Sequence, residues 1–539
     1  MSRQNDPFVT SSQLRRRLLF CTLFATVALV LVVSHVYYPD ALSSDTSTET
    51  WVLELELDDP TDAGNGTTSK VDLADPEILA AMRVDELFRR QSQTVAEAAT
   101  KYSMRYNRPP PPNFDRWFAY AQENHCLIDD YRQIQRDLEP FYQLAREDPD
   151  HFRRMADLGS RLLRVDPKGM VAIRIVDGQV RLPDYAGTPY DGEWQRGMSN
   201  VRPPSVLSPP PPHEIQFSSV LPDMEFLING RDEPRVVFNT ADPNNRKAAL
   251  MISDSQPFRL TPLPTADFFK DRRECAVIDT DQGFGIDALD AVPFIRSSST
   301  SEFTTDLYPL LSMTKLASPC FADIVFPAQW YYASSPWSGN FQHADDIPWQ
   351  AKKDVLYWRG MSNNGQILHQ NYHAFTRFRL VKLAATRPDI MDAKMTGWFP
   401  GHCTTDCVPE PIIKEYITPG GAHPREEVYK YKFALDVDGH TFSGRFLGLL
   451  RSGSLVFKAT AFTEYFSDWL RPYEHYIPVR IDLADLVEKV EWAIAHEEEA
   501  RQIQLNGLHF AERVMTDRQN DCYLAAALLE WARLQSGRT

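Results

Sequence analysis

Apolar and polar positions change their pattern several times along the 539 residues, and the first pattern is a continuous apolar run. Residues 18–38 are almost wholly apolar, which is enough to cross a bilayer core of roughly 30 Å. Arg15, Arg16 and Arg17 precede this run, and such positive charge stays on the cytosolic side. The pattern predicts an uncleaved signal anchor after a cytosolic tail, residues 1–17. A cleaved signal peptide is the alternative, but the run ends without the small residues that cleavage prefers.

Residues 39–107 begin as a stretch rich in Ser, Thr, Asp and Gly, which predicts an extended luminal stem. A helical pattern follows at about Pro76 to Tyr106, and the proline run at 109–112 predicts a stiff spacer before the folded body. Asn65 begins the only N-glycosylation sequon of the chain, which fits a luminal address for this stem.

The next pattern predicts a first domain over residues 108–345. Helical periodicity runs from Asn113 to Arg164, and two β-rich runs flanking Asp177 and Gly178 predict a hairpin. Short apolar runs farther along are expected to be buried strands of one sheet. These runs lie at Glu225 to Ile228, Val236 to Phe238, Ala276 to Ile278 and Ile324 to Phe326.

Strands and helices alternate more regularly over residues 346–539, which predicts a second domain with a parallel, doubly wound sheet. Ligands of such sheets bind outside the carboxyl ends of the strands, so the site is expected in the loops after Trp358 and Val437. The expected strands are Val355 to Trp358, Phe433 to Val437, Leu455 to Lys458 and Tyr476 to Ile481, and the expected helices lie near His373 to Ala385, near Gly444 to Arg451 and onward to Leu534.

The charge balance limits the class of partner. The chain carries 57 Lys plus Arg against 73 Asp plus Glu, a net charge of −16. This balance argues against a protein that binds nucleic acid by neutralising its phosphates. An anionic ligand must therefore be bound by local cations.

Six cysteines follow the predicted anchor, an even number that suits disulfides in an oxidising compartment, although the sequence leaves their pairing open. His402, Cys403 and Cys407 match no standard zinc spacing, so a local disulfide or buried thiols is the favoured interpretation there. The six are Cys126, Cys275, Cys320, Cys403, Cys407 and Cys522.

The segment from Lys430 to Phe446 places a turn at Gly439 after a strand, and then Ser443, Gly444 and Arg445 at the start of a helix. Free backbone N–H groups, the positive end of the helix dipole and a guanidinium together suit a diphosphate. The alternative is that Ser443 caps the helix and Arg445 is a surface cation.

Further cations are candidates for the same crevice. Arg359 and Gly360 follow the strand that ends near Trp358, where glycine allows close approach of the backbone to a ligand. Lys432 lies within a strand and is either a charge at a sheet edge or a third phosphate contact.

Carboxylates supply a candidate base. Asp223, Glu225 and Asp232 bracket an expected buried strand, and a carboxylate at a strand end can take a proton from a hydroxyl, although each is also a common turn or surface residue. The pairs Asp436 with Asp438 and Asp279 with Asp281 allow a metal-dependent alternative, although Asp-x-Asp arises often in an acidic chain.

Five segments in order resemble the blocks of glycosyltransferase family 90, which includes fungal capsule-associated xylosyltransferases and Rumi-type protein O-glucosyltransferases. The likeness spans about Asn113 to Leu534. The segments are LPDMEFLINGRDEP from Leu221, LYWRG from Leu356, KYKFALDVDGHTFSGRF from Lys430, GSLVFKA from Gly453 and HYIPVRIDLADL from His475.

The resemblance implies a GT-B architecture, in which two Rossmann-like domains face a cleft, and an inverting reaction that needs no metal and no cofactor besides the UDP-sugar co-substrate. It implies Asp223 as the base with Asp232 as the fallback. It places Arg359 and Arg445 on the diphosphate, and Gly439, Ser443 and Glu464 in nucleotide-binding blocks. Gly360, Lys432 and Gly444 complete the expected donor site.

The chain also departs from the Rumi-type members. Asp438 stands where those members carry arginine, and the loop from Gly397 to Pro424 does not follow them. The expected protein is a single-pass type II enzyme of the Golgi or endoplasmic reticulum membrane that moves a xylose- or glucose-type sugar to a hydroxyl of a glycan, glycolipid or glycoprotein. A metal-dependent transferase and an inert carbohydrate-binding membrane protein are the alternatives.

Overall fold

The computed structural model of the protein describes residues 75–163, 170–181, 217–229, 234–239, 242–252, 260–261, 303–304, 306–317, 321–332, 347–365, 367, 370–403 and 407–537. The chain divides into two units, residues 1–71 and 72–539, and every described residue belongs to the second. The predicted anchor and the sequon at Asn65 lie outside the described residues. Among the helices that are described, none has the length and apolar character needed to cross a bilayer.

Helices dominate the first part of this unit. The single helical pattern over 113–164 is three helices in the structure, and one break falls at His125, which has a left-handed φ of 53°. Two earlier helices, predicted within the stem, belong to the same unit as the body, and α2 packs against α15. The helices are α2 (Pro76–Arg89), α3 (Val95–Tyr106), α4 (Phe114–Glu123), α5 (Arg132–Glu147) and α6 (His151–Leu163).

A first sheet of five strands has the order β2-β1-β3-β6-β8. β1 pairs antiparallel with β2 and β3, and β3, β6 and β8 are parallel. The predicted hairpin is confirmed, since Asp177 and Gly178 turn with φ values of 52° and 68°. The strands are β1 (Met170–Val176), β2 (Gln179–Arg181), β3 (Met224–Asn229), β6 (Leu311–Ser312) and β8 (Ile324–Val325).

The predicted strand at Val236 to Phe238 is only a pair of isolated bridges, from Val236 to Thr304 and from Val237 to Phe321. The predicted strand at Ala276 to Ile278 lies outside the described residues. Smaller elements complete this region: α8 (Pro243–Leu250), the pair β4 (Leu260–Thr261) and β5 (Phe303–Thr304), and β7 (Lys315–Leu316).

The second sheet is parallel throughout and has the order β10-β9-β11-β12-β14, which confirms the predicted α/β class. All seven residues of β11 are buried, as expected for a strand between two neighbours. β10 was not predicted, and β14 is shorter than expected. The strands are β9 (Lys353–Met361), β10 (Met391–Gly397), β11 (Tyr431–Val437), β12 (Leu455–Ala459) and β14 (Ile477–Pro478).

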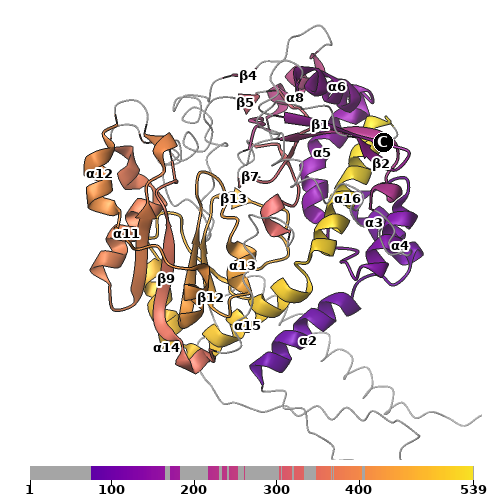
Figure 1. Cartoon of the computed structure of the whole chain (residues 1–539). Coiled ribbons are helices and arrows are strands. Elements are labelled where there is room, and N and C mark those ends of the chain that lie inside the picture. The colour runs from indigo at the N-terminus through magenta and orange to yellow at the C-terminus, as the bar shows by residue number, and fades with distance from the viewer. Residues whose placement is uncertain are drawn as a thin grey trace, which may run out of the picture. The chain divides into compact units, whose positions relative to one another are not determined.

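Helices flank the second sheet, and the last helix returns to the first. α11 packs against β10, and α13 and α15 pack against β12. α16 runs back along α4, α5 and α6 and contacts β3, so the C-terminal helix lies beside N-terminal ones (Figure 1). The helices are α11 (Thr376–Thr386), α12 (Pro409–Tyr416), α13 (Phe446–Leu450), α14 (Leu486–Ala495), α15 (Glu497–Arg513) and α16 (Asp517–Gln535).

Two disulfides close this architecture. Cys126 pairs with Cys522, which joins the turn after α4 to α16, and Cys403 pairs with Cys407 in the loop after β10. The local disulfide that the sequence favoured over a zinc site is therefore confirmed. Cys275 and Cys320 lie outside the described residues.

The carboxyl ends of the parallel strands of both sheets meet. After β6, strand β7 pairs with β13 (Phe462–Thr463), which follows β12. The hydroxyl of Thr314 donates to the carbonyl of Thr463 at 2.9 Å. The GT-B arrangement of two separate domains stays a prediction, but the two edges that it would bring together are in contact here.

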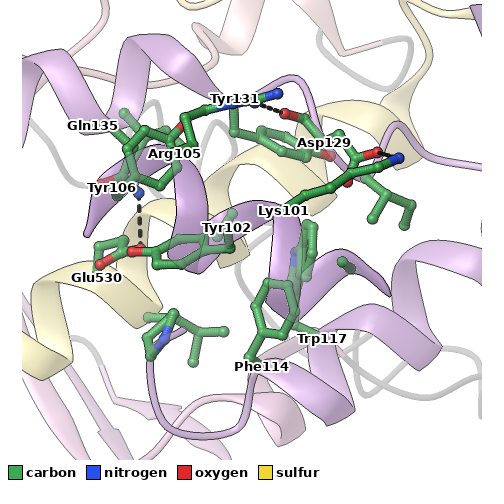
Figure 2. Close-up of a pocket in the computed structure, with 16 residues that line it drawn as sticks. Lys101, Tyr102, Arg105, Tyr106, Phe114, Trp117, Asp129, Tyr131, Gln135 and Glu530 are labelled. Carbon is green, nitrogen blue, oxygen red and sulfur yellow. Dashed lines mark hydrogen bonds and ion pairs between the residues drawn. The ribbon is translucent and has the colours of Figure 1, made fainter. Parts of the chain in front are cut away.

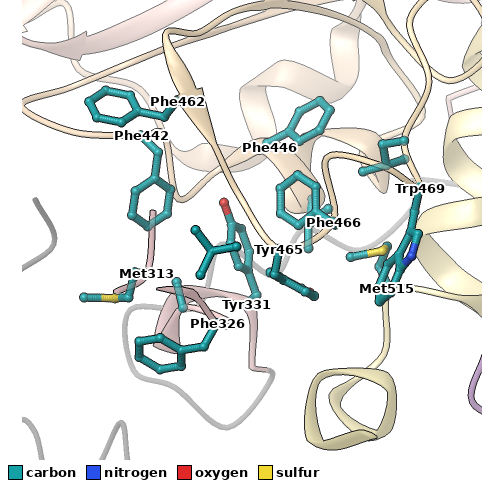
Figure 3. Packing of buried hydrophobic residues seen from close by; sticks show 14 of the residues in the cluster. Met313, Phe326, Tyr331, Phe442, Phe446, Phe462, Tyr465, Phe466, Trp469 and Met515 are labelled. Carbon is teal, nitrogen blue, oxygen red and sulfur yellow. The ribbon is translucent and has the colours of Figure 1, made fainter. Parts of the chain in front are cut away.

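Aromatic side chains fill this junction. Tyr331, which follows β8, lies among Phe442, Phe466 and Tyr465 of the second sheet's loops (Figure 3). Its ring meets that of Phe466 edge to face at 5.3 Å. Burial of these rings fixes the loops that carry the polar residues of the site.

Candidate active site

The strand order of the second sheet indicates where a ligand site lies. The chain passes from β9 to β10 on one side and then crosses to β11 on the other side of β9. Connections on opposite sides leave a crevice between the loops after β9 and β11, which is where ligands bind in sheets of this kind. This agrees with the loops that the sequence indicated, after Trp358 and after Val437.

Arg445 lies at this crevice. It is the residue before α13, and its Nη1 donates to the carbonyl of Arg359 at 2.8 Å, which links the loop after β11 to β9. Its Nη2 is buried without a hydrogen-bond partner among the described residues. Burial lowers the pKa of Arg445, and Asp436 opposes this shift. An unpaired guanidinium nitrogen beside a crevice suits an anionic ligand.

The helix start itself contributes less than the sequence suggested. α13 has only five residues, so its dipole is small, and Arg445 must supply most of the positive charge. Ser443 is buried and donates its hydroxyl to Asp436, so it ties the loop to β11 rather than capping the helix.

The two predicted glycines of this region are needed for packing. A Cβ at Gly444 would lie 1.7 Å from the indole of Trp330, and a Cβ at Gly360 would lie 2.4 Å from the ring of Trp358. Neither position admits a side chain without moving an aromatic ring. Gly439 lies in the tight turn after β11, where its N–H donates to the carbonyl of Thr441 at 2.8 Å.

Arg359 is near the crevice, but its guanidinium turns away from it. Nη2 donates to the carboxylate of Asp392 at 2.8 Å, and Nη1 donates to the carbonyl of the same residue at 2.7 Å. The guanidinium also lies over the ring of Tyr357, at 4.6 Å from the centroid. These contacts engage the guanidinium of Arg359 within the sheet, so the geometry does not support the predicted binding of a diphosphate by this side chain.

Lys432 is at the wrong end of its strand for a phosphate contact. It is the second residue of β11, whereas the crevice lies at the carboxyl end. Its Nζ lies 2.7 Å from Asp354 and 2.6 Å from Glu497, so two carboxylates already neutralise it. The prediction placed this lysine by sequence neighbourhood alone.

Glu464 belongs to a buried polar cluster beneath the crevice. Lys458 lies 3.0 Å from Asp436 and 3.6 Å from Glu464, and the hydroxyl of Tyr331 donates to Glu464. Lys458, Asp436 and Glu464 are each at most 6% exposed. The cluster therefore joins the loop after β8 to β11, β12 and the loop beyond β12.

The charges of this cluster follow from its burial. Burial raises the pKa of Glu464 to about 8, against the opposing effect of Lys458. Burial likewise raises the pKa of Asp438 to about 7, against Lys458 and the amide of Ala461. Burial alone would lower the pKa of Lys458, but Asp436 and then Glu464 more than offset this and raise it. At neutral pH the lysine is charged and Glu464 is mostly protonated.

The first candidate base lies at the wrong edge of the first sheet. Asp223 precedes β3, so it is at the amino end of that strand, while the junction lies at the carboxyl end. It is exposed, and its Oδ1 accepts the N–H of Asp177 at 2.8 Å, which stabilises the β1–β2 turn. Glu225 forms an ion pair with Arg174. Asp232 lies outside the described residues, between Asn229 at the carboxyl end of β3 and Pro234.

The Asp-x-Asp pairs are differently placed. Asp436 contacts Lys458 and Ser443, and Oδ2 of Asp438 accepts the N–H of Ala461 at 2.7 Å. Asp279 and Asp281 lie outside the described residues. Within the part of the chain that is described, no three or more His, Cys, Asp or Glu side chains are grouped as metal ligands would be.

Sequence reasoning missed Arg377, at the start of α11. It is 6% exposed, and its Nε donates to the carbonyl of Asp438 at 2.9 Å, while Nη1 donates to the carbonyl of Met361 at 2.9 Å. It therefore bridges the loops after β9 and β11. Its position in the sequence could have indicated it, because Arg377 begins the first α-helix after β9, and the loop between these two elements contributes to the ligand site in doubly wound sheets.

A separate cavity lies among α3, α4, α5 and α16 (Figure 2). Its volume is about 50 Å³, which holds a few water molecules but no sugar or nucleotide. Of its two carboxylates, Glu530 accepts from Tyr102 at 2.5 Å and from Gln135 at 2.8 Å, and Asp129 accepts from Lys101 at 3.0 Å. Because both carboxylates already have partners, the cavity is a packing feature.

The fold and the crevice together define a class, the α/β proteins that bind a ligand at the carboxyl edge of a parallel sheet. Residues 277–539 match the model of glycosyl transferase family 90, and these residues contain the whole second sheet. This part of the chain is a glycosyltransferase family 90 domain, as the resemblance of its segments suggested.

Curated relatives carry related descriptions. Protein O-glucosyltransferase 2 of Danio rerio is 32% identical over 188 residues, 35% of this chain and 34% of the relative. Protein O-glucosyltransferase 3 of Homo sapiens is 28% identical over 191 residues, which are 35% of this chain and 34% of the relative. Protein O-glucosyltransferase 1 of Homo sapiens is 26% identical over 254 residues, which are 46% of this chain and 58% of the relative. The chain thus spans about a third of the length of the first two relatives.

Proposed function

We propose that the chain is an inverting, metal-independent glycosyltransferase that moves a xylose- or glucose-type sugar from a UDP-sugar to a hydroxyl of a glycan, glycolipid or glycoprotein. The observation that carries this proposal is the unpaired Nη2 of Arg445 at the crevice between the loops after β9 and β11. The family 90 match of residues 277–539 supports sugar transfer as the reaction. The names of the relatives support a glucose-type sugar and a protein acceptor.

In this reaction the acceptor oxygen attacks the anomeric carbon as the bond from that carbon to the diphosphate oxygen breaks. The electron pair of the broken bond leaves with UDP, and Arg445 stabilises the charge that develops there. The hydroxyl proton passes to a carboxylate. A single displacement of this kind inverts the anomeric centre.

For the base we propose Asp232 rather than Asp223. The position of Asp232 in the chain follows the carboxyl end of β3, and the carboxyl ends of β6 and β8 lead into the junction with the second sheet. Asp223 is six residues nearer the amino end of that strand than Asn229 and is engaged by the turn at Asp177. An exposed turn-stabilising carboxylate at the far edge has no route to a substrate in the crevice.

The proposed setting is the lumen of the Golgi or endoplasmic reticulum, with residues 18–38 as a type II anchor. Two disulfides in the described part of the chain support an oxidising compartment. The acidic composition supports the absence of a nucleic-acid partner.

The test uses the full-length chain in detergent and a panel of UDP-sugars, with release of UDP as the signal. Wild type should turn over at least one donor. Arg445→Ala should lose UDP affinity by about 10-fold or more, because it removes a charge-assisted contact. Arg387→Ala is the matched control, since this arginine pairs with Asp389 and Glu491 on the surface.

A second comparison tests the base. Asp232→Asn should abolish transfer while UDP binding is retained, and Asp223→Asn should retain transfer. A wild-type chain that binds no UDP would refute the proposed function. Full transfer by Asp232→Asn with loss of transfer in Asp223→Asn would refute only the assignment of the base.

A further inference from the structure

A groove lies beside α2, at the opposite edge of the second sheet from the crevice. It is lined by α2, by the start of α5, by α15 and by the chain that precedes β14, and its volume is about 700 Å³. β14 is parallel to β12, so residues 471–475 are at the amino end of the sheet, whereas the crevice is at the carboxyl end. Ligand pockets have volumes of roughly 300–1,000 Å³, so this α2 groove is large enough to hold a ligand.

One face of α2 forms a wall of the groove. Leu79, Arg83, Glu86 and Arg90 all line it, and they recur every three or four positions, which places them on one side of the helix. Leu79 is 37% exposed, so a ligand can reach the apolar part of this wall. Arg83 and Arg90 are seven positions apart, which is about 10 Å along a helix. The wall therefore carries cations at an interval of about the length of a disaccharide.

Two arginines of the groove have no anionic partner. Within the residues that the structure describes, neither Arg90 nor Arg132 forms an ion pair or a side-chain hydrogen bond. Their segments are adjacent, because Gln91 donates to the carboxylate of Asp130 at 2.8 Å. The chain as a whole has a net charge of −16, so carboxylates are abundant, yet none neutralises these two cations. Exposed guanidinium groups of this kind bind oxyanions through paired hydrogen bonds.

The carboxylates of the groove limit the kind of anion that it can bind. Glu474 lies 2.7 Å from Arg471 and 3.6 Å from Arg83, so two arginines share one carboxylate and this group keeps one positive charge. Asp468 lies 2.6 Å from Arg136. A densely charged ligand such as a polyphosphate would be repelled by these carboxylates. Their remaining lone pairs can instead accept hydrogen bonds from hydroxyl groups.

The apolar side chains of the groove argue against a lipid tail. Trp469 and Phe510 line it, but they are only 6% and 4% exposed, and the indole N–H of Trp469 already donates to the carbonyl of Asp130 at 2.6 Å. No accessible aromatic slot for an acyl chain is present among the described residues of the groove. The lining thus suits a ligand with many hydroxyl groups and with acid groups at intervals.

We propose that the α2 groove binds an acidic glycan, an oligosaccharide that carries carboxylate or sulfate groups on some of its sugars. Arg90 and Arg132 bind one acid group, and Arg83 with Arg471 binds another farther along α2. Sugar hydroxyl groups donate to the carboxylates between them. This inference goes beyond the proposed function, because it places a glycan away from the crevice and needs no nucleotide.

The experiment measures dissociation constants by calorimetry on the full-length chain in detergent. The probes are a heparin-derived hexasaccharide with sulfate and carboxylate groups, an oligogalacturonate of the same length with carboxylates alone, and neutral maltohexaose. Wild type should bind the heparin fragment saturably and should not bind maltohexaose. Arg90→Ala and Arg132→Ala should each weaken binding of the heparin fragment about 10-fold, because each removes a charge-assisted contact.

Arg116→Ala is the matched control. Arg116 on α4 is exposed, does not line the groove and, like Arg90 and Arg132, has no ion-pair partner among the described residues. Its removal changes the net charge by the same amount and should leave the affinity for the heparin fragment within about twofold of wild type. All three arginines are exposed, so the variants should fold, and a melting curve of each one checks this.

Weak binding in Arg90→Ala and Arg132→Ala, with normal binding in Arg116→Ala, supports the inference, and the oligogalacturonate shows whether carboxylates suffice. The inference is overturned if wild type binds neither acidic fragment, if it binds maltohexaose as tightly, or if Arg116→Ala loses as much affinity. Displacement of the heparin fragment by an equal concentration of inorganic phosphate overturns it as well, because the site would then bind small anions. A wild-type chain that binds the heparin fragment but no UDP refutes the proposed function alone.

Discussion

Replacing Lys458 by methionine tests the buried charge cluster beneath the crevice. The lysine is 6% exposed and lies 3.0 Å from Asp436 and 3.6 Å from Glu464, each of which is 1% exposed. Methionine keeps most of the packing volume but removes the only cation in contact with either carboxylate among the described residues. Removal of one partner from a buried ion pair costs about 3–5 kcal/mol. We expect a loss of stability of this size for Lys458→Met near pH 8.

The loss should shrink as the pH falls. In the variant the pKa of Glu464 should rise further, because burial raises it and Lys458 is the main effect that opposes burial, so the folded variant keeps this proton over a wider pH range and its stability decreases as pH rises through that range, by up to about 1.4 kcal/mol per pH unit for one proton. In wild type the pKa of Lys458 is raised, so its contribution is complete below the unfolded lysine value of about 10.4 and is lost only above it. Wild type releases the Glu464 proton above about pH 8, whereas the variant keeps it, so the difference in stability between the two proteins should be larger at pH 9 than at pH 7.

Urea unfolding followed by tryptophan fluorescence measures this difference, and Lys432→Met is the matched control. Lys432 is equally buried and also has two carboxylate partners, but Asp354 and Glu497 are 57% and 52% exposed and can be solvated when the lysine is lost. The control should lose about 1 kcal/mol or less, with unchanged UDP affinity. Equal losses in the two variants, or a loss in Lys458→Met that does not depend on pH, would refute the reasoning.

The affinity for UDP should fall as pH rises from 7 to 9, because burial raises the pKa of Glu464 to about 8 and this carboxyl group ionises near the site in that range. Calorimetry at several pH values measures this affinity, and Glu464→Gln should make it nearly independent of pH. An affinity of the wild-type protein that rises with pH would contradict the prediction. Cys126→Ser should lower the free energy of unfolding by up to about 6 kcal/mol, and Cys403→Ser should lower it by about 2 kcal/mol. The two losses differ because the disulfides close loops with sequence separations of 396 and 4. Urea titrations measure both values, and equal losses would count against the loop-closure explanation. Turnover should be unchanged after treatment with a chelator and dialysis, whereas loss that manganese restores would favour the metal-dependent alternative.

The sequence by itself determined the class of fold and the general place of the site. Burial on both faces gives strands β9, β11 and β12 continuous apolar runs, so periodicity located them within a few residues. Alternation of strands with helices then predicted the parallel sheet, and the loops after Trp358 and Val437 followed from that topology. β10 was not predicted because its sequence MDAKMTG has little β-branched or aromatic content, although its alternation of apolar and polar positions is a strand pattern.

The surroundings of individual cations and carboxylates, on which their proposed roles rest, are set only by the tertiary structure. Asp223 and Asp232 are nine positions apart in one segment, but they flank opposite ends of β3, and sequence resemblance alone could not say which end meets the second sheet. Arg359 and Arg377 were likewise indistinguishable as charges. A guanidinium that already binds a carboxylate is less available to a ligand, and the position of the partly buried Asp392 on the neighbouring strand, set by the register of β10 against β9, gives Arg359 such a partner.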